Sequence, residues 1–296
     1  MAPMDVWQGD EIAFLGGGNM ARALIAGLLR QGLGAGRIRV GEPHEALRNA
    51  LAADFGVRTS ADNAPMLAGA TLVVLAVKPQ DALTALQSLH AVSSAAPAPT
   101  LLSIAAGVTI ASLGQACPPE VSIVRAMPNR PALVGAGVTG LYAPGTTPAA
   151  ARAAAERVAR AAGQAVWLRR EAELDLVTAL SGSGPAYFFL LAEQLAGAAT
   201  RLGLAAETAN LLAAETLYGA GLLAHRALAA ESAGTLAAER GAVTSRGGTT
   251  EAALRVLADG GFESLVQRAL QAAASRSAEL AAAAAANAAN TTKAAR

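Results

Sequence analysis

A glycine-rich turn near the start of the chain constrains the fold more than any other feature of the sequence. Residues 12–15 are four apolar residues that predict a buried strand, and they run directly into the three glycines at 16–18. The apolar spacing that follows, through Leu28, predicts a helix. Glycines let the backbone approach a pyrophosphate closely, and the first turn of a helix offers unpaired N–H groups to it. With Ala21 in the third small position, the pattern G-x-G-x-x-A predicts a dinucleotide-binding turn.

Length and composition narrow the class of protein. A chain of 296 residues has room for two domains, and a net charge of +1 with 15% charged residues argues against a nucleic-acid partner. No charge-free apolar run reaches the roughly 20 residues that a membrane span needs. The first ten residues lack the features of a secretory signal. A single cysteine, Cys117, excludes an internal disulfide and a cysteine-based metal site. We therefore expect a soluble, cytoplasmic protein with no membrane partner.

Strands alternate with helices in the first half of the chain, which predicts βαβ units and a mostly parallel, doubly wound sheet. The last two strands are separated from the earlier ones by short turns, and their pairing is left open. The predicted strands cover residues 12–15, 37–40, 71–77, 100–105, 121–124, 137–142 and 165–168.

From residue 171 onward the sequence shows helical periodicity and no convincing strand. The apolar faces are too numerous for one small bundle, so we expect a second subunit to bury the surplus. The predicted helices cover residues 173–180, 186–202, 206–230, 249–258 and 262–280, with a polar loop at 241–248. The resulting domains are an N-terminal tail (1–10), a dinucleotide-binding domain (11–170), a helical domain (171–280) and a C-terminal tail (281–296) that is a frayed helix or disordered.

Glu42 follows the second predicted strand, where the ribose of a bound dinucleotide is expected. An acidic residue at this place accepts hydrogen bonds from a 2′-hydroxyl and repels a 2′-phosphate, which mildly favours NADH over NADPH. The alternative is that Glu42 is a solvated turn residue, and that Arg39, Arg48 or a backbone group binds a phosphate. The sequence leaves both interpretations open.

Lys78 stands just past the apolar run 71–77, which reads as a central strand. Ligands of open α/β sheets bind in the crevice outside the carboxyl ends of such strands, so this position indicates a ligand contact. The alternative is a surface lysine whose stem covers apolar residues.

Four blocks, in their order and spacing, resemble the pyrroline-5-carboxylate reductase family. They are Phe14-Leu15-Gly16-Gly17-Gly18-Asn19-Met20-Ala21, Ala76-Val77-Lys78-Pro79, Ser181-Gly182-Ser183-Gly184-Pro185-Ala186-Tyr187 and Gly247-Gly248-Thr249-Thr250, with Arg125-Ala126-Met127-Pro128-Asn129 between them. The resemblance covers about residues 11–280. It implies a Rossmann-like N-terminal domain and a helical domain that forms a homodimer, often assembled further into a decamer. It also implies reduction of the cyclic imine of 1-pyrroline-5-carboxylate to L-proline by NAD(P)H, the last step of proline biosynthesis.

The same resemblance, together with the position of Glu42 after the second strand, assigns residues to sites. The expected cofactor-binding residues are Gly16, Gly17, Gly18, Asn19, Met20, Glu42, Asn63, Ala76, Val77, Lys78, Pro79, Ala105, Ala106 and Gly107. The expected substrate-binding residues are Glu171, Gly247, Gly248, Thr249 and Thr250. Two positions depart from the usual family pattern: Arg130 stands where threonine is usual, and Arg246 stands where proline usually precedes the Gly-Gly-Thr-Thr block.

Hydride transfer to a protonated imine needs orientation and charge compensation more than side-chain chemistry. The start of a helix at 247–250 predicts an anion site for the substrate carboxylate, against the alternative of an ordinary threonine-capped helix. We expect Thr250 to hold the ring nitrogen or to relay a proton to it through water, because a hydroxyl is a weak acid. Lys78 is expected to orient and to act through its charge, and these two are the candidate catalytic residues.

Other chemistries find little support. His44, His90 and His225 have no second ligand at helical spacing, so no metal site is expected. Ser181 and Ser183 lack the preceding strand that a nucleophile elbow requires. One rival is another dehydrogenase or imine reductase with a helical second domain, whose first long helix carries a lysine or aspartate. Here the helix 186–202 offers Glu193 and Gln194 but no lysine. The other rival is a catalytically silent paralogue that binds NAD(P)H.

Overall fold

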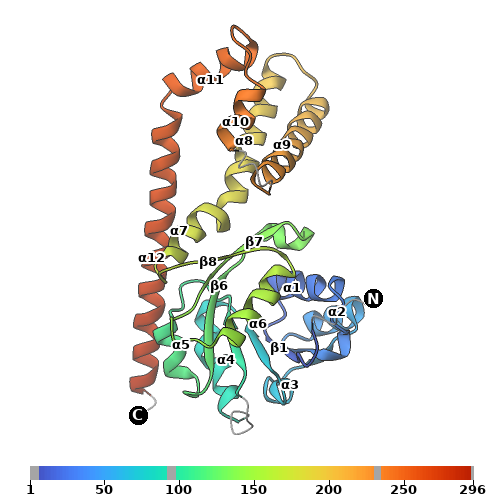
Figure 1. Ribbon diagram of the computed structural model, residues 1–296, viewed down its shortest axis with the longest axis vertical. Coiled ribbons are helices and arrows are strands. Elements are labelled where there is room, and N and C mark those ends of the chain that lie inside the picture. The colour runs from blue at the N-terminus through green and yellow to red at the C-terminus, as the bar shows by residue number, and fades with distance from the viewer. Residues whose placement is uncertain (1–6, 92–97, 230–234, 295–296) are drawn as a thin grey trace. The chain divides into compact units, whose positions relative to one another are not determined.

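The computed structural model describes residues 7–91, 98–229 and 235–294, with residues 91, 229 and 284–294 described by their backbone alone. Contacts divide the chain into two compact units (Figure 1). Unit 1 comprises Met1–Gly182 and Ala273–Arg296, and unit 2 comprises Ser183–Ala272. Residues 1–6 of the expected N-terminal tail, residue 230 of the third expected helix and residues 295–296 of the expected C-terminal tail lie outside the described residues.

Unit 1 is built on one sheet, in which the described residues form eight strands in the order β3-β2-β1-β4-β5-β6-β7-β8. All neighbours pair in parallel except β6 and β7, which are antiparallel. The strand order reverses between β1 and β4, and this switch point is where open α/β sheets bind ligands. The strands are β1 (Ile12–Leu15), β2 (Ile38–Gly41), β3 (Arg58–Ser60), β4 (Leu72–Leu75), β5 (Thr100–Ser103), β6 (Ser122–Met127), β7 (Gly137–Tyr142) and β8 (Gly163–Trp167).

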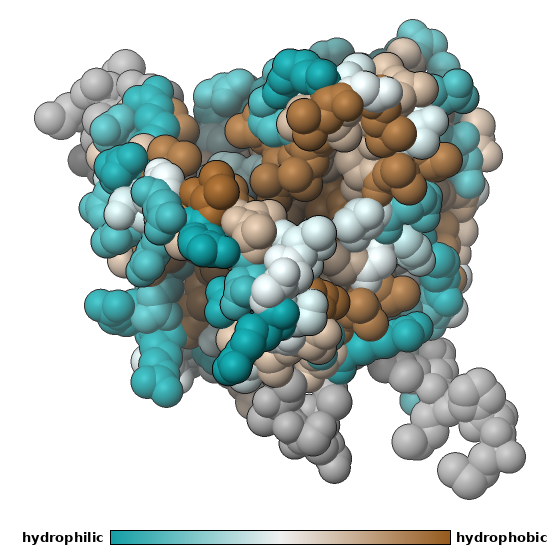
Figure 2. Space-filling view, turned by 90° about the horizontal axis from the view of Figure 1, so that it is seen from above, coloured by the Kyte–Doolittle hydropathy of each residue, from teal (hydrophilic) through white to brown (hydrophobic). Residues whose placement is uncertain are grey.

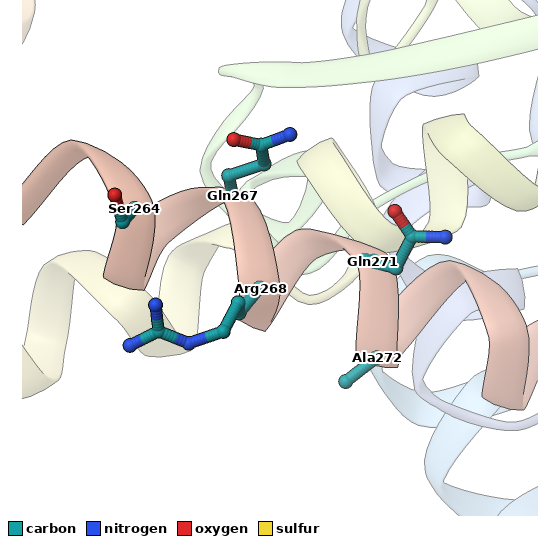
Figure 3. A pocket seen from close by; sticks show the side chains of 5 residues that line it. All are labelled: Ser264, Gln267, Arg268, Gln271 and Ala272. Carbon is teal, nitrogen blue, oxygen red and sulfur yellow. The ribbon is translucent and has the colours of Figure 1, made fainter.

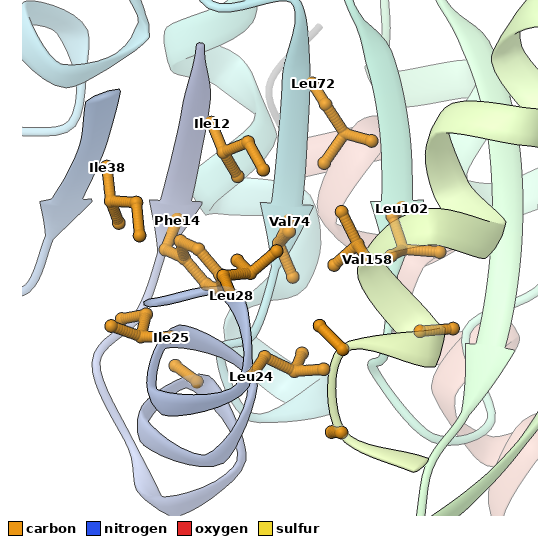
Figure 4. Close-up of a cluster of buried hydrophobic side chains, with 14 of the residues drawn as sticks. Ile12, Phe14, Leu24, Ile25, Leu28, Ile38, Leu72, Val74, Leu102 and Val158 are labelled. Atoms are coloured by element: carbon orange, nitrogen blue, oxygen red, sulfur yellow. The ribbon is translucent and has the colours of Figure 1, made fainter. Parts of the chain in front are cut away.

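Helices cover both faces of this sheet. One face packs against α1 (Asn19–Arg30), α2 (Glu45–Phe55) and α6 (Ala149–Arg160), and Figure 4 shows part of that core, with Phe14 of β1 against α1 and Val158 of α6 beside Leu102. The other face packs against α3 (Ala64–Leu67), α4 (Ala82–Leu86) and α5 (Ile110–Ala116). The central strands β1 and β4 are buried along their whole length, because helices cover them from both sides.

One strand of this sheet was not predicted from the sequence. The edge strand β3 is only three residues long, and its pattern Arg-Thr-Ser is polar, so hydrophobic periodicity gives it no signal. The pairing that the sequence left open is resolved at the other end. There β7 runs antiparallel to β6, while β8 returns parallel to β7 through α6.

Residues 7–10 are packed against unit 1 and do not form a free tail. Trp7 is buried, and its Nε1–H donates to the carbonyl oxygen of Gln31 at 3.2 Å. The carboxylate of Asp10 pairs with Arg157 of α6 at 2.8 Å.

In the residues that the structure describes, the secondary-structure elements of unit 2 are all helices, joined by loops. Its elements are α8 (Gly184–Arg201), α9 (Ala206–Ala229), α10 (Leu236–Ala242), α11 (Thr249–Asp259) and the first part of α12 (Phe262–Ala294). The sequence analysis assigned no helix to α10, which includes the first residues of the predicted polar loop at 241–248. The helix predicted at 173–180 is instead α7 (Glu173–Val177) followed by a π-helical turn at Thr178–Gly182.

The helix α12 is longer than the sequence analysis expected. Its backbone stays helical to Ala294, whereas we expected it to end near Leu280 and to be followed by a frayed or disordered tail. Alanine, which dominates residues 281–289, has the highest intrinsic helix propensity, and this favours continuation. Contacts within unit 1 also hold the helix, because Ser277 Oγ donates to Asp175 Oδ1 at 2.7 Å.

Unit 2 exposes large apolar side chains, and hydrophobic side chains are widespread on the face that Figure 2 shows. Those of α8 include Phe188, Phe189, Leu190, Leu191 and Leu195, and those of α9 include Leu211, Leu212 and Tyr218. Among the described residues, one helical stretch, Glu173–Arg201, is long and apolar enough to cross a membrane by length and composition. The sequence search, which required a charge-free run, did not select this stretch.

We expect Gly27→Ala to destabilise unit 1. Gly27 lies in α1, and a Cβ there would overlap the carbonyl of Ala161, which belongs to the backbone that follows α6. Forcing the two segments apart should cost about 1–3 kcal/mol of unfolding free energy, seen as a thermal midpoint lower by roughly 3–10 °C. Gly36→Ala is the control, because a Cβ at Gly36 would meet no atom within 4 Å. Equal midpoints for the two variants would contradict this packing.

Candidate functional site

The glycine turn lies directly against the end of β4, at the switch point of the sheet. Gly16 has a φ of +96°, and a Cβ there would come within 2.9 Å of the Ala76 carbonyl and of Val77 Cγ1. Its N–H donates to the carbonyl oxygen of Gly41 at 2.8 Å, which ties the turn to the end of β2 as well. Both the left-handed backbone and the close approach require glycine at this position.

The start of α1 suits a phosphate. Gly18 is the N-cap, no side chain caps the helix, and its first turn carries no acidic residue. The N–H groups at the start of a helix carry a partial positive charge and point outward from the helix end, so they can receive the oxygens of a pyrophosphate. The three glycines, Asn19 and Met20 therefore form a cradle that fits a dinucleotide.

Glu42 is buried, with an exposed fraction of 5%, and its carboxylate holds the glycine turn. Gly17 N–H donates to Oε2 at 2.8 Å, His44 N–H donates to Oε1 at 2.9 Å, and the His44 ring Nδ1 lies 2.6 Å from the same oxygen. Burial alone raises the pKa of Glu42, but the hydrogen bonds from His44 and Gly17 outweigh it and the pKa lies below its ordinary value. Glu42 is thus neither a solvated turn residue nor a carboxylate with both oxygens free for a ribose.

The cations considered as phosphate ligands differ in their availability. Arg39 is buried within β2, where its guanidinium donates to the carbonyl of Ala68, so it does not reach the glycine turn. Arg48, on α2, donates to the carbonyl oxygens of Glu42 and Pro43 at 2.9 and 2.7 Å. Arg48 is therefore the one of the two that lies at the turn after β2.

The remaining expected cofactor residues lie at the carboxyl ends of neighbouring strands. Asn63, the N-cap of α3, lies against Gly41 so closely that a Cβ on Gly41 would overlap its Oδ1. Ala76 and Val77 follow β4 and contact Gly16, and exposed Lys78 precedes the short 3-10 helix Pro79–Asp81. The fold thus brings Asn63, the residues after β4 and the glycine turn to one edge of the sheet.

The turn after β5 contains Ala105, Ala106 and Gly107. Gly107 has a φ of +75°, and a Cβ there would lie 3.2 Å from Cα of Ala281 in α12. The last part of unit 1 in the sequence therefore packs against a turn that was assigned to the nicotinamide end of the cofactor. The sequence analysis treated residues from 281 onward as a tail and gave no sign of this contact.

Glu171 is engaged inside unit 1. Its Oε1 accepts hydrogen bonds from Ile110 N–H at 2.8 Å and from Arg125 Nη1 at 2.7 Å. The carboxylate thus joins the first residue of α5 to the strand β6, where Arg125 is largely buried. Its expected contact with substrate stays a prediction, whereas its role in holding these two elements is structural.

The Gly-Gly-Thr-Thr block forms the start of α11 in unit 2. Gly248 is the N-cap, Thr249 and Thr250 are the first two helical residues, and no side chain caps the helix end. Gly247 N–H donates to Glu251 Oε2 at 2.7 Å, and Gly248 N–H donates to the carbonyl oxygen of Ser245 at 3.0 Å. Two of the loop's N–H groups are therefore used internally, so an anion would be bound by the N–H groups of Thr249, Thr250 and Glu251 and by the threonine hydroxyls.

The other candidate sites offer fewer groups that could bind a ligand or react. A surface hollow on unit 2 is lined by one face of α12, and Figure 3 shows its polar side chains Gln267, Arg268 and Gln271 projecting from that single helix. Burial raises the pKa of the Cys117 thiol to about 12, which leaves it unreactive at neutral pH. Within the described part of the chain, no group of three or more His, Cys, Asp or Glu side chains could hold a metal ion.

Comparison with known proteins agrees with this geometry. Residues 171–280 match the family described as pyrroline-5-carboxylate reductase dimerisation, and residues 11–107 match the family described as NADP oxidoreductase, coenzyme F420-dependent. A pyrroline-5-carboxylate reductase of Pseudomonas aeruginosa is 45% identical over 270 residues, which cover 91% of this chain and 96% of that protein. The chain belongs to the pyrroline-5-carboxylate reductase family.

Solved structures of this family share the fold. The pyrroline-5-carboxylate reductase of Coxiella burnetii superposes with a TM-score of 0.85 at 40% identity, covering 92% of this chain and 98% of that one. The pyrroline carboxylate reductase of Plasmodium falciparum, solved with NADP bound, gives a TM-score of 0.76 at 25% identity, with coverages of 92% and 98%. The resemblance predicted from the four sequence blocks is therefore confirmed, as is a Rossmann-like domain followed by a helical domain.

Three features of this candidate site were not predicted from the sequence. They are the bond from Gly17 to Glu42, the ion pair of Glu171 with Arg125, and the bond from Gly247 to Glu251. The first two join residues 25 and 46 positions apart, so no local sequence pattern predicts them. The third has a sequence signal, since a glutamate at the third residue of a helix commonly reaches back to the N–H groups before it.

We expect Glu42 to make stability depend on pH. Its pKa is lower in the folded than in the unfolded chain, so its contribution is present above the unfolded value, about 4.3, and is lost as the pH falls through the folded value. The difference in unfolding free energy between the wild type and Glu42→Gln should be largest above about pH 5 and should shrink below it. Denaturant unfolding at several pH values measures this difference. Glu45→Gln, an exposed change on α2, is the control, and a pH-independent difference for Glu42→Gln would contradict the assignment.

Proposed function

We propose that this protein reduces the cyclic imine of 1-pyrroline-5-carboxylate to L-proline with NADPH or NADH, as the last step of proline biosynthesis. The observation that carries the proposal is the 45% identity over nearly the whole chain to a protein named for that reaction. The glycine turn that fits a dinucleotide and the loop at the start of α11 support it, since the reaction needs an anion site for each of its two ligands.

The chain's own residues bind, orient and compensate charge. The bound nicotinamide would supply the hydride, and a protonated imine accepts it readily. In our proposal the glycine turn and Asn63 hold the nucleotide end of the cofactor, while the residues 76–79 and 105–107 hold its nicotinamide end. The N–H groups at the start of α11 and the hydroxyl of Thr249 receive the substrate carboxylate. Exposed Lys78 orients the ligands and acts through its charge, without forming a covalent bond.

The assembly of the active enzyme follows from the apolar surface of unit 2. We propose a homodimer formed through the helical domain, with a decamer, built from five such dimers, as the higher assembly that the family resemblance implies. Residues 171–280 match a dimerisation family, and side chains such as Phe189, 60% exposed in the single chain, need a partner surface. The same dimer interface accounts for the apolar stretch Glu173–Arg201 without a membrane, so we propose a cytoplasmic enzyme with neither a membrane nor a nucleic-acid partner.

The experiment that tests the reaction follows the absorbance of the reduced nicotinamide after purified protein is mixed with cofactor and 1-pyrroline-5-carboxylate. Loss of the reduced form with this substrate supports the proposal. Turnover only with 2-hydroxy acids would instead indicate a different dehydrogenase. Cofactor binding without turnover would indicate a catalytically silent paralogue.

Thr250→Ala should lower kcat by roughly tenfold to a hundredfold with little effect on cofactor affinity. In the proposed mechanism the Thr250 hydroxyl holds the ring nitrogen, or a water beside it, during hydride transfer, so its loss raises the barrier by about 1.4–2.7 kcal/mol. Thr250→Ser keeps the hydroxyl and should retain most of the activity. Steady-state kinetics with both substrates measure the effect, and an unchanged kcat in Thr250→Ala would remove Thr250 from the mechanism.

The choice of cofactor rests on Glu42, which we propose favours NADH mildly. Its lowered pKa keeps the carboxylate ionised, and a buried negative charge beside the ribose site repels a 2′-phosphate. Wild-type kcat/KM should therefore be a few-fold higher with NADH. Glu42→Gln should weaken both cofactors, because the anchor of Gly17 is damaged, but should shift the ratio toward NADPH. A wild type that prefers NADPH would contradict this reading and would point to Arg48 as the ligand of the 2′-phosphate.

A further inference from the structure

The loop that precedes α11 is a tight turn with an unusual second residue. Gly248 N–H donates to the carbonyl oxygen of Ser245 at 3.0 Å, and Gly247 between them has a φ of +73°. A turn closed in this way with a positive φ at its third residue has the pattern of a type II turn, which favours proline second and glycine third. Arg246 occupies the second position, where the family resemblance places proline. The φ restriction that a proline ring supplies is therefore missing here.

A side chain of the helix holds this turn instead. Glu251, the third residue of α11, accepts a hydrogen bond from Gly247 N–H through Oε2 at 2.7 Å. A glutamate at this helix position ordinarily reaches back to the N–H of the N-cap residue. In this chain that N–H belongs to Gly248 and already bonds Ser245, so the carboxylate bonds the residue before it. This hydrogen bond joins the third residue of the tight turn, Gly247, to the first helical turn of α11.

We propose that Glu251 is a positioning residue that replaces the missing proline ring and pre-organises the start of α11 for the substrate carboxylate. The inference rests on the proposed function, in which the N–H groups of Thr249, Thr250 and Glu251 receive that carboxylate. Because the Glu251 side chain turns back to Gly247, its negative charge is neutralised in part by an N–H group. The role depends on the accepting oxygen and not on the charge.

Glu251→Ala should raise the KM for 1-pyrroline-5-carboxylate about fivefold to twentyfold, as expected for the loss of one hydrogen bond that holds a binding loop. The kcat should stay within about twofold, and the affinity for the reduced cofactor should not change, because the cofactor is held by other residues. Glu251→Gln keeps an accepting oxygen and should restore the wild-type KM. Glu263→Ala, which removes an exposed glutamate from the first turn of α12, is the matched control and should leave the KM unchanged.

A double-mutant cycle tests whether the hydrogen bond of Glu251 replaces the φ restriction that a proline at position 246 would supply. In an Arg246→Pro background the ring restricts the turn, so adding Glu251→Ala should raise the KM less than about twofold. In an Arg246→Ala background, which removes the same charge without adding a ring, Glu251→Ala should keep its full effect. The Arg246→Pro/Glu251→Ala and Glu251→Gln variants also keep the test decisive if Glu251→Ala alone folds poorly.

The outcomes separate the two proposals. A wild type that does not reduce 1-pyrroline-5-carboxylate would overturn the proposed function. An active wild type with an unchanged KM in Glu251→Ala, a Gln variant as impaired as the Ala variant, or equal effects in the proline and alanine backgrounds would each overturn the role of Glu251 alone.

Discussion

The close contact between the glycine turn and the end of β4 is the constraint on which unit 1 depends. Gly16 can meet the Ala76 carbonyl and Val77 only because it has no side chain and adopts a positive φ. The contact lies where the strand order reverses, so it brings the start of α1 to the edge of the sheet at which open α/β sheets bind ligands. A Cβ at this position would come within 2.9 Å of the Ala76 carbonyl, so the turn and the end of β4 would have to move apart.

Carboxylates hold loops of both units by the same physical means. Glu42 receives Gly17 N–H, Glu171 receives Ile110 N–H, and Glu251 receives Gly247 N–H. An ionised acceptor makes a stronger hydrogen bond to a backbone N–H than a neutral acceptor does. Each carboxylate thus fixes a segment of backbone without itself needing to touch a ligand.

The two units differ in how much apolar surface they leave exposed in the single chain. Unit 1 covers both faces of its sheet with its own helices, and its central strands are fully buried. Unit 2 leaves Phe188, Phe189 and their neighbours exposed in the single chain, and its sequence matches a dimerisation family. The apolar excess that composition indicated is therefore located on the helical unit, where a partner surface can cover it.

The sequence by itself determined the glycine turn, the alternation of strands and helices along the first half of the chain, the family, and the change to helices after residue 171. These features are written in local patterns: turn residues, apolar runs and helical periodicity. Only the tertiary structure decided that Glu42 turns inward to Gly17, that β7 runs against β6, and that Ala281 packs on Gly107. Such contacts join residues far apart in the chain, and their geometry exists only after the elements have packed, so local periodicity carries no information about them.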